Sequence, residues 1–278
     1  GGTGIQGEAN LIFDGNTLEI GGNLVVRSSI GGDDVLSVDT NGAFCIGDPA
    51  GLGNEAYIQG NGCIQIFSYG SERARFNDQG TTSFGDVNSH TITGTDSTIA
   101  GGSTNTISSS LGFIGGGSTN SINTTAECSF IGGGYNNRVC ATACWGTVVG
   151  GCSNYVSNDG GTTAGGRLNC NTGACGFIGG GLQNYVQGQI GAVAGGAANC
   201  ARGNCSFTGG GYSNDAFGAF STVAGGYNNS ACAACSTIGG GQSLFIHSCQ
   251  KHAVIGGGRA NCITYFSGYT PAAANDGN

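Results

Sequence analysis

Between residues 99 and 255 one apolar or threonine residue recurs at a short fixed interval, and glycines follow it each time. We call this residue the anchor of its unit. Successive anchors are separated by 15 or 17 residues. Six residues after the anchor stands an asparagine, with Leu244 as the one exception, and two residues later most units return to Ile or Val. The eleven anchors are Ile99, Ile114, Ile131, Val148, Thr163, Ile178, Val193, Thr208, Val223, Ile238 and Ile255.

A short fixed period predicts a stack, because each unit buries its apolar side only against its neighbours. Fifteen residues allow two short strands and two turns. The paired glycines indicate a corner with positive φ or close backbone approach, and the asparagines predict a ladder of amides, each bonding to the next coil. The 17-residue spacings contain two more residues than the 15-residue ones, and an even insertion preserves the alternation of inward and outward side chains along a strand. We therefore predict an all-β fold, an elongated β-solenoid or β-roll of about eleven coils and about 50 Å in length.

The first ninety residues follow a different pattern. Alternating residues on both sides of Asp14-Gly15-Asn16 predict a β-hairpin over 10–20. A strand, tight turn, strand module over 38–48 returns 38 residues later over 76–86. We expect three regions: β-hairpin fibre or shaft modules over 1–90, the glycine-rich solenoid over 91–263, and a C-terminal cap or tip over 264–278.

The composition agrees with a solenoid and points to association. The 278 residues include 59 Gly and no Met, and only 9% are charged. A single chain of this composition has few large side chains with which to build a hydrophobic core of its own. Ser or Gly stands two places before most anchors, for example at Ser97 and Gly112. We expect these small residues to form a face suited to a crowded axis, and therefore a homotrimer.

Charge distribution and hydropathy argue against two classes of partner, nucleic acids and membranes. Residues 1–96 carry 12 acids and 3 bases, whereas residues 97–263 carry 3 acids and 5 bases, so the net charge of −8 belongs mainly to the first region. No basic stripe of a nucleic-acid-binding protein is present. No apolar run reaches the roughly 20 residues of a membrane helix, so we expect no membrane insertion.

Fourteen cysteines are many for such a chain. Two C-x4-C pairs occupy identical repeat positions 30 residues apart, and a closer pair lies in a corresponding loop. One interpretation is a disulfide within each loop, as in proteins outside the cell; the other is small buried thiols packed along the stack. Zinc is not expected, because neighbouring Cys/His pairs are missing. The disulfide candidates are Cys170 with Cys175, Cys200 with Cys205, and Cys232 with Cys235.

Two stretches carry a resemblance to known families. Residues 71–80 (SERARFNDQG) and 36–42 (LSVDTNG) resemble modules of bacteriophage tail fibres, which often precede a self-cleaving chaperone domain. The units of anchor, glycines and asparagine resemble the β-roll heads of trimeric autotransporter adhesins and similar repeats in phage and large-virus fibres. The resemblance implies a homotrimer on a virion surface or outside the cell, contact with other virion or fibre proteins, receptor binding and no cofactor.

Residue types typical of catalysis are present without the expected pattern. His247 and His252 are close in sequence to Cys249, but a repeat insertion is an unpromising setting for a nucleophile and base. Polysaccharide-cleaving tailspikes use two carboxylates about 5–9 Å apart, whereas Glu127, Asp159 and Asp215 occupy different repeat positions. The glycine runs lack the Lys-Ser/Thr of a phosphate loop. We expect no catalysis.

Aromatic residues give the clearer functional pattern. Three tyrosines share the position after the glycines, where amphipathic rings suit stacking on sugars or packing against a protein receptor; a packing ladder between coils or subunits is the alternative. The C-terminal region adds aromatic residues at the expected tip. The candidate receptor-binding residues are Tyr135, Tyr212, Tyr227, Tyr265, Phe266 and Tyr269.

The sequence thus favours a structural and adhesive trimeric fibre protein that binds a cell-surface glycan or protein receptor. The head of a bacterial trimeric adhesin is the nearest alternative. An ice-binding β-solenoid would need an unbroken threonine array. The threonines before the anchors, such as Thr147 and Thr162, are interrupted by phenylalanines such as Phe130 and Phe177. A polysaccharide-degrading tailspike is the remaining alternative.

Overall fold

The computed structural model describes residues 11–13, 18–20, 63–68, 71–77, 79–85 and 89–264. Within these ranges every named element is a β-strand, and no helix there is long and apolar enough to cross a membrane. The chain divides into two compact units, Gly1–Ile58 and Gln59–Asn278.

The first unit contains the predicted hairpin. Strands β1 (Leu11–Phe13) and β2 (Leu18–Ile20) pair antiparallel, with Leu11 opposite Ile20. This confirms the antiparallel strand pairing of the predicted hairpin, whereas the turn residues Asp14-Gly15-Asn16 lie outside the described residues. The first copy of the 38-residue module, over 38–48, lies outside the described residues.

The second unit begins with a three-stranded antiparallel segment. Strands β3 (Cys63–Ser68), β4 (Ser71–Asn77) and β5 (Thr82–Phe84) pair in chain order. Asn77 shapes the turn between β4 and β5, because its Oδ1 accepts hydrogen bonds from the backbone N–H groups of Gln79 (3.1 Å) and Thr81 (3.0 Å). This confirms the strand, turn, strand module over 76–86. Strand β5 then pairs in parallel with β7, so residues 63–84 extend the sheet of the solenoid.

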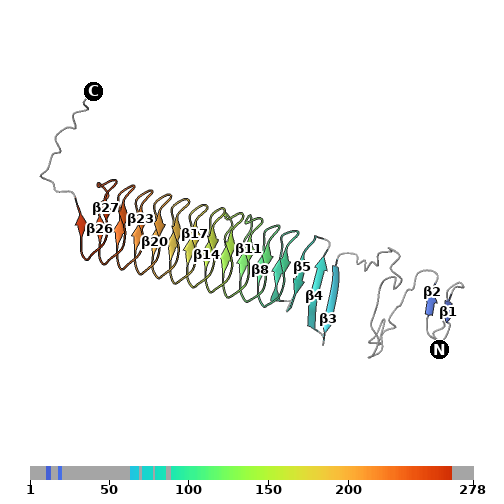
Figure 1. Cartoon of the computed structure of the whole chain (residues 1–278). Helices are drawn as coiled ribbons and strands as arrows, with labels where there is room; N and C mark the ends of the chain where they lie inside the picture. The colour runs from blue at the N-terminus through green and yellow to red at the C-terminus, as the bar shows by residue number, and fades with distance from the viewer. Residues whose placement is uncertain are drawn as a thin grey trace, which may run out of the picture. The chain divides into compact units, whose positions relative to one another are not determined.

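From β6 onward each coil adds one two-residue strand to each of two parallel sheets, and the coils stack side by side (Figure 1). The fourteen-stranded sheet, which we call the anchor sheet, contains β3, β4, β5 and then β7 (Thr98–Ile99), β9 (Phe113–Ile114), β11 (Phe130–Ile131), β13 (Thr147–Val148), β15 (Thr162–Thr163), β17 (Phe177–Ile178), β19 (Ala192–Val193), β21 (Phe207–Thr208), β23 (Thr222–Val223), β25 (Thr237–Ile238) and β27 (Val254–Ile255).

The twelve-stranded sheet, which we call the asparagine sheet, follows the repeated asparagines. It contains β6 (Thr91–Ile92), β8 (Thr106–Ile107), β10 (Ser121–Ile122), β12 (Arg138–Val139), β14 (Tyr155–Val156), β16 (Cys170–Asn171), β18 (Tyr185–Val186), β20 (Cys200–Ala201), β22 (Asp215–Ala216), β24 (Ser230–Ala231), β26 (Phe245–Ile246) and β28 (Cys262–Ile263). All eleven predicted anchors are the second residues of anchor-sheet strands, so the predicted β-solenoid is confirmed.

The apolar interior lies between the two sheets. Anchors such as Ile114 and facing residues such as Ile122 are fully buried, and burying each such side chain stabilises the fold by about 1.5–3 kcal/mol. The solenoid therefore has its own core. The core consists of three clusters, and the breaks between them coincide with the buried polar residues Thr163, Asn171 and Thr208.

The small residues two places before the anchors also point into this interior. Ser97 and Ser221 are fully buried by their own chain, and a methyl group at Gly112 would lie 2.7 Å from Cγ2 of Ile107. Residues two apart in a strand share a face, so these residues lie on the buried side with the anchors. The expectation that they form an outer face at a trimer axis is therefore wrong.

The asparagine ladder is present, and it bonds mainly to backbone. In Asn120, Nδ2 donates to the carbonyls of Gly116 (3.0 Å) and Gly134 (2.9 Å), and Oδ1 accepts from the N–H of Asn137 (3.0 Å). Each buried amide thus joins its own corner to the next coil. These hydrogen bonds supply the partners that buried polar groups require.

The position three residues after each anchor but the last requires glycine for two reasons: its backbone has a positive φ, and the next coil leaves no room for a Cβ atom. Gly117 has φ +80°, and a methyl group there would lie 2.0 Å from the carbonyl oxygen of Gly134 in the next coil. The residue that follows forms a third row of parallel bridges, running from Ser103 to Arg259.

The two extra residues of the longer coils lie in one turn. In the coil that begins at Ile114 they lengthen the connection from β10 to β11, where Ala126 is fully buried. Phe130 still pairs with Phe113, and Ile131 with Ile114. An even insertion therefore leaves the strand register unchanged.

Candidate functional site

The three predicted solenoid tyrosines lie on the bridge row at the glycine corner, and all are exposed. Tyr212 and Tyr227 are adjacent in the row, with stacked rings whose centroids are 5.6 Å apart and whose planes differ by 11°. Both side chains are 51% exposed. Tyr135 is 56% exposed and stands apart from them, between Ser118 and Cys152. The structure therefore brings together two of the three.

A second aromatic row covers the outer side of the anchor sheet, and we did not predict it as a binding surface. Phe113 and Phe130 stack with centroids 5.5 Å apart and planes 3° from parallel. Each ring lies over the glycine two residues further on, since a methyl group at Gly132 would be 3.3 Å from Cε1 of Phe130. Strand alternation contained this signal, because the residue before an inward anchor points outward.

This outer surface of the anchor sheet, which we call the phenylalanine face, carries no charged residue from β7 to β27. Thr147 and Thr162 lie side by side between Phe130 and Phe177 in the same row. The row therefore mixes hydroxyl groups with flat apolar rings. The residues immediately before the anchors are Thr98, Phe113, Phe130, Thr147, Thr162, Phe177, Ala192, Phe207, Thr222, Thr237 and Val254.

In the structure the cysteines of the predicted loop pairs are separate thiols, and the loop disulfides stay a prediction. The twelve cysteines from Cys128 to Cys262 are free thiols. Cys170 is half-buried in β16, whereas Cys175 is exposed in the following turn, where its N–H donates to the carbonyl of Asp159 in the previous coil (2.8 Å). Cys200, in β20, and Cys205 are separated in the same way. Cys232 follows β24 and is half-buried in the turn that also contains the exposed Cys235. None of these thiols lies in the core, so the alternative of buried packing is not seen either.

One charged cluster lies on the asparagine sheet. Nη1 of Arg202 is 3.5 Å from Oδ2 of Asp215, and Nη2 donates to Sγ of Cys200 at 3.7 Å. Burial raises the pKa of the Asp215 carboxyl, while Arg202 lowers it. Burial, and then the neighbouring Asp215, raise the pKa of the Cys200 thiol. The thiol is therefore kept protonated, which is the opposite of what a nucleophilic cysteine needs.

The three carboxylates of residues 97–263, Glu127, Asp159 and Asp215, lie in three different coils. In the strand register the neighbours of Asp215 are Cys200 and Ser230.

Glu127 and Asp159 share one turn position two coils apart, with Cys144 between them. This follows because the N–H of Trp145 donates to the carbonyl of Glu127 and that of Gly160 donates to the carbonyl of Cys144. The expectation that these two residues occupy different repeat positions is therefore wrong. Oδ1 of Asp159 also accepts a hydrogen bond from the N–H of Cys144 (3.0 Å). Among the described residues no group of three or more His, Cys, Asp or Glu side chains has the arrangement of a metal site.

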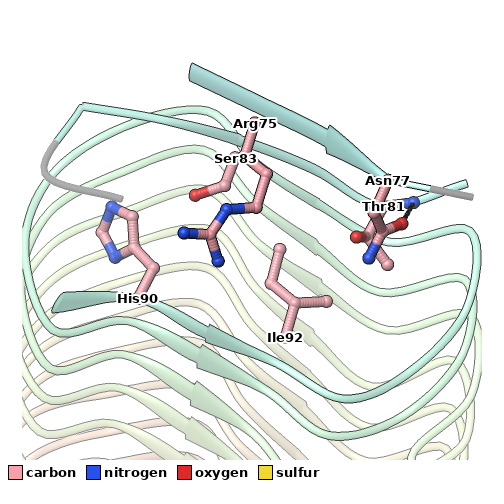
Figure 2. A pocket seen from close by; sticks show the side chains of 6 residues that line it. All are labelled: Arg75, Asn77, Thr81, Ser83, His90 and Ile92. Atoms are coloured by element: carbon pink, nitrogen blue, oxygen red, sulfur yellow. Dashed lines mark hydrogen bonds between the residues drawn. The ribbon is translucent and has the colours of Figure 1, made fainter. Parts of the chain in front are cut away.

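A small cavity of about 50 Å³ lies where β4 and β5 cover the first coil. Figure 2 shows Arg75 and His90 above Ile92, with Asn77 and Thr81 at the opposite side. Ser83 also lines the cavity, and its buried Oγ has no hydrogen-bond partner. The volume suits one water molecule. We assign the cavity to the junction of the covering hairpin with the solenoid.

The predicted tip residues Tyr265, Phe266 and Tyr269 lie outside the described residues. Among known proteins, no protein-family model matches the sequence, and no curated protein matches it.

Proposed function

We propose that this chain is a structural and adhesive protein that binds a cell-surface glycan or protein receptor through aromatic rings on a rigid β-solenoid. The observation that carries the proposal is the stacked pair Tyr212 and Tyr227, half-exposed at the glycine corner. Two parallel rings with free edges and phenolic hydroxyl groups offer both a stacking surface and hydrogen-bond partners.

The scaffold supports this role because it holds the rings at a fixed spacing. Tyr212 and Tyr227 donate their N–H groups to the carbonyls of Gly226 and Gly241, both at 2.9 Å. The corner beneath them is also fixed by Asn214 and Asn229, which are fully buried. A surface that is ordered before binding loses little conformational entropy when the ligand arrives.

We further propose that the protein is a homotrimer, located on a virion surface or outside the cell, and that it binds without catalysis. The phenylalanine face supports self-association, because it presents four exposed phenylalanines and the row before the anchors is uncharged, and the centres of subunit interfaces are likewise rich in aromatic residues and poor in charge. Three linked copies present each weak site three times, which raises avidity by about 10²–10⁴ when the sites engage together. Other virion or fibre proteins are the remaining proposed partners.

The test of adhesion compares the full chain with the double variant Tyr212→Ala/Tyr227→Ala on a printed array of purified glycans and on intact cells. We expect binding to fall at least about tenfold, the equivalent of 1.4 kcal/mol. Gln242→Ala is the matched control, since Gln242 follows Tyr227 in the same exposed row.

Unchanged binding of the double variant, with its oligomeric state intact, would remove the receptor site from the tyrosine pair. Absence of binding by the unmodified chain to every glycan and cell type would contradict adhesion. Native mass spectrometry tests the trimer separately, and a folded monomer in dilute solution would contradict it.

A further inference from the structure

A regular surface of the solenoid is formed by the turns that connect each asparagine-sheet strand to the next anchor-sheet strand. Three residues before every anchor, the backbone adopts the left-handed conformation with φ between 51° and 63°. We call these positions the turn-edge row. Glycine, the residue that suits this conformation best, occupies one of them. The row is Asp96, Leu111, Cys128, Trp145, Gly160, Cys175, Ile190, Cys205, Phe220, Cys235 and His252.

Apart from Asp96, Gly160 and His252, the members of this row carry apolar or thiol side chains, and these side chains are exposed. Trp145 is 65% exposed and Phe220 is 62% exposed.

Left-handed backbone costs roughly 1–2 kcal/mol for residues with a Cβ, and the β-branched Ile190 is an outlier there. A second row with the same backbone conformation runs from Thr104 to Ala260, so the conformation belongs to the coil geometry. The turn-edge row differs in presenting large apolar side chains and thiols to solvent.

The row is also regular, because hydrogen bonds hold each member one coil from the last. The N–H groups of Ile190, Cys205 and Phe220 donate to the preceding coil, to the carbonyls of Ala174, Gln189 and Asn204, each at 2.8 Å. Coils bonded in this way lie about 4.8 Å apart. Cys175, Cys205 and Cys235 are therefore evenly spaced at two-coil intervals, with one apolar residue between each pair.

This spacing prevents disulfides along the row within one chain. Two coils separate successive thiols by about 9–10 Å, whereas a disulfide needs its Cα atoms within about 4.4–6.8 Å. The three thiols are exposed and free. A surface that presents thiols at the same two-coil spacing is available in a second copy of this chain.

We propose that the turn-edge row from Cys175 to Cys235 is a pairing surface for a second copy, which disulfides then join. In a two-fold arrangement centred on this segment, Cys205 meets Cys205 of the other copy. A parallel pair joins each of the other thiols to its own equivalent, and an antiparallel pair joins Cys175 to Cys235. The apolar Ile190 and Phe220 fill the intervening positions in both arrangements.

The local charge pattern permits this approach. The residues that precede the row members in this segment are Ala174, Gln189, Asn204, Ala219 and Ala234, and none is charged. Arg202 is the one charged residue in the turns of this segment, and its guanidinium lies 3.5 Å from the Asp215 carboxylate of its own chain. This internal ion pair reduces the repulsion between two identical surfaces. The pairing does not rest on the proposed receptor binding, because the turn edge and the glycine corner lie at opposite ends of the strands. Both sheet faces remain free for the proposed trimer.

The covalent step uses glutathione disulfide as the oxidant. A Cys205 thiolate attacks one sulfur of glutathione disulfide, and one glutathione thiolate leaves. The Cys205 thiolate of the other copy then attacks the mixed disulfide at the protein sulfur, and the second glutathione thiolate leaves. In sum, two protein thiols and one glutathione disulfide become one protein disulfide and two glutathione thiols, with two electrons transferred.

The experiment incubates the reduced full chain with glutathione disulfide and separates the products by non-reducing electrophoresis. We expect a covalent dimer, with Cys205 joined to Cys205 in fragmentation mass spectra of its chymotryptic peptides. The row variant Cys175→Ser/Cys205→Ser/Cys235→Ser should lose this dimer. The matched control Cys170→Ser/Cys200→Ser/Cys232→Ser removes three half-buried thiols from the same coils and should retain it.

A second variant separates docking from chance collision of reactive thiols. Ile190→Asp/Phe220→Asp keeps every thiol but places like charges opposite one another, so it should form the dimer several-fold more slowly. Circular dichroism confirms that each variant is folded. An unchanged rate in this variant, an undiminished dimer in the row variant, or an unmodified chain that stays monomeric with its thiols bridged within loops or still free would overturn the proposal.

Discussion

At the scale of single residues, the asparagine ladder concentrates the hydrogen bonding between coils. Nδ2 of Asn184 donates to the carbonyls of Gly180 (2.8 Å) and Gly196 (3.0 Å), and Oδ1 accepts from the N–H of Asn199 (3.0 Å). Replacing Asn184 with Ala leaves buried backbone groups without these partners. We expect the free energy of unfolding to fall by about 2–4 kcal/mol, measured by denaturant titration followed by circular dichroism.

Asn261 provides the control for this substitution. It occupies the same repeat position in the last coil, is exposed, and makes one of these bonds, from Nδ2 to the carbonyl of Gly257 (2.8 Å). Asn261→Ala should therefore change the free energy of unfolding by less than about 1 kcal/mol. Equal losses for the two substitutions would mean that the ladder bonds are not the source of the effect.

The position of the ladder was predictable from sequence, but its chemistry was only partly so. A polar residue repeated at one buried position must find partners in adjacent coils, and this follows from periodicity alone. The partners turned out to be mainly backbone groups, because the glycine corner brings the carbonyls of Gly116 and Gly134 within reach of Asn120. Leu244 shows that one coil tolerates the loss of the amide, since its N–H still donates to Asn229 (2.9 Å).

At the scale of the structural element, the two glycines of a corner have different tasks. A methyl group at Gly166 would lie 2.2 Å from the carbonyl oxygen of Gly181, and Gly166 has φ +84°, whereas a methyl group at Gly165 would meet no atom within 4 Å. Gly166→Ala should lower the free energy of unfolding by about 2–4 kcal/mol, through left-handed backbone and overpacking.

The neighbouring substitution tests this explanation within the same corner. Gly165→Ala should leave the midpoint of chemical unfolding nearly unchanged. If both alanine variants unfolded at the same denaturant concentration, the corner would depend on glycine for chain flexibility and not for space.

Strand alternation explains both the success and the error of reading elements from this sequence. The two-residue period placed every anchor inside correctly. The same period places Ser97 and Gly112 inside with Ile99 and Ile114, and they were assigned to an outer face because small size was weighed above position in the strand. The phenylalanine face and the turn-edge row were missed for a related reason, since both consist of outward residues at positions between the predicted landmarks.

At the scale of the whole solenoid, each coil contacts mainly its neighbours, and the repeat period sets the fold more directly than any single residue does. This is why the architecture was predictable while the binding surface was less so. Tyr135, Tyr212 and Tyr227 share one repeat position, but exposure and stacking distinguish the last two as a pair. Oligomeric state depends on how outer faces meet, and a period within one chain carries no information about that.

A one-dimensional stack makes a prediction about deletions that a globular core does not. Removing residues 193–207 deletes one 15-residue coil and joins Ala192 to Thr208, so that an anchor-sheet residue again precedes an anchor. The register is kept, and only one coil's share of stability is lost, about 1–2 kcal/mol. Removing residues 193–206 instead leaves an anchor spacing of 16 residues from Ile178 to Thr208, whereas the spacings in the chain are 15 or 17. Compared with a 15-residue coil, the one extra residue either bulges out of a turn or inverts a strand. An inverted strand would expose apolar anchors and bury outward residues such as Phe207. Thermal unfolding monitored by circular dichroism should therefore show a cooperative transition near that of the unmodified chain for the first deletion, and a much lower or broadened one for the second. Indistinguishable melting of the two variants would show that the turns absorb odd insertions freely and that register does not restrict the coil length.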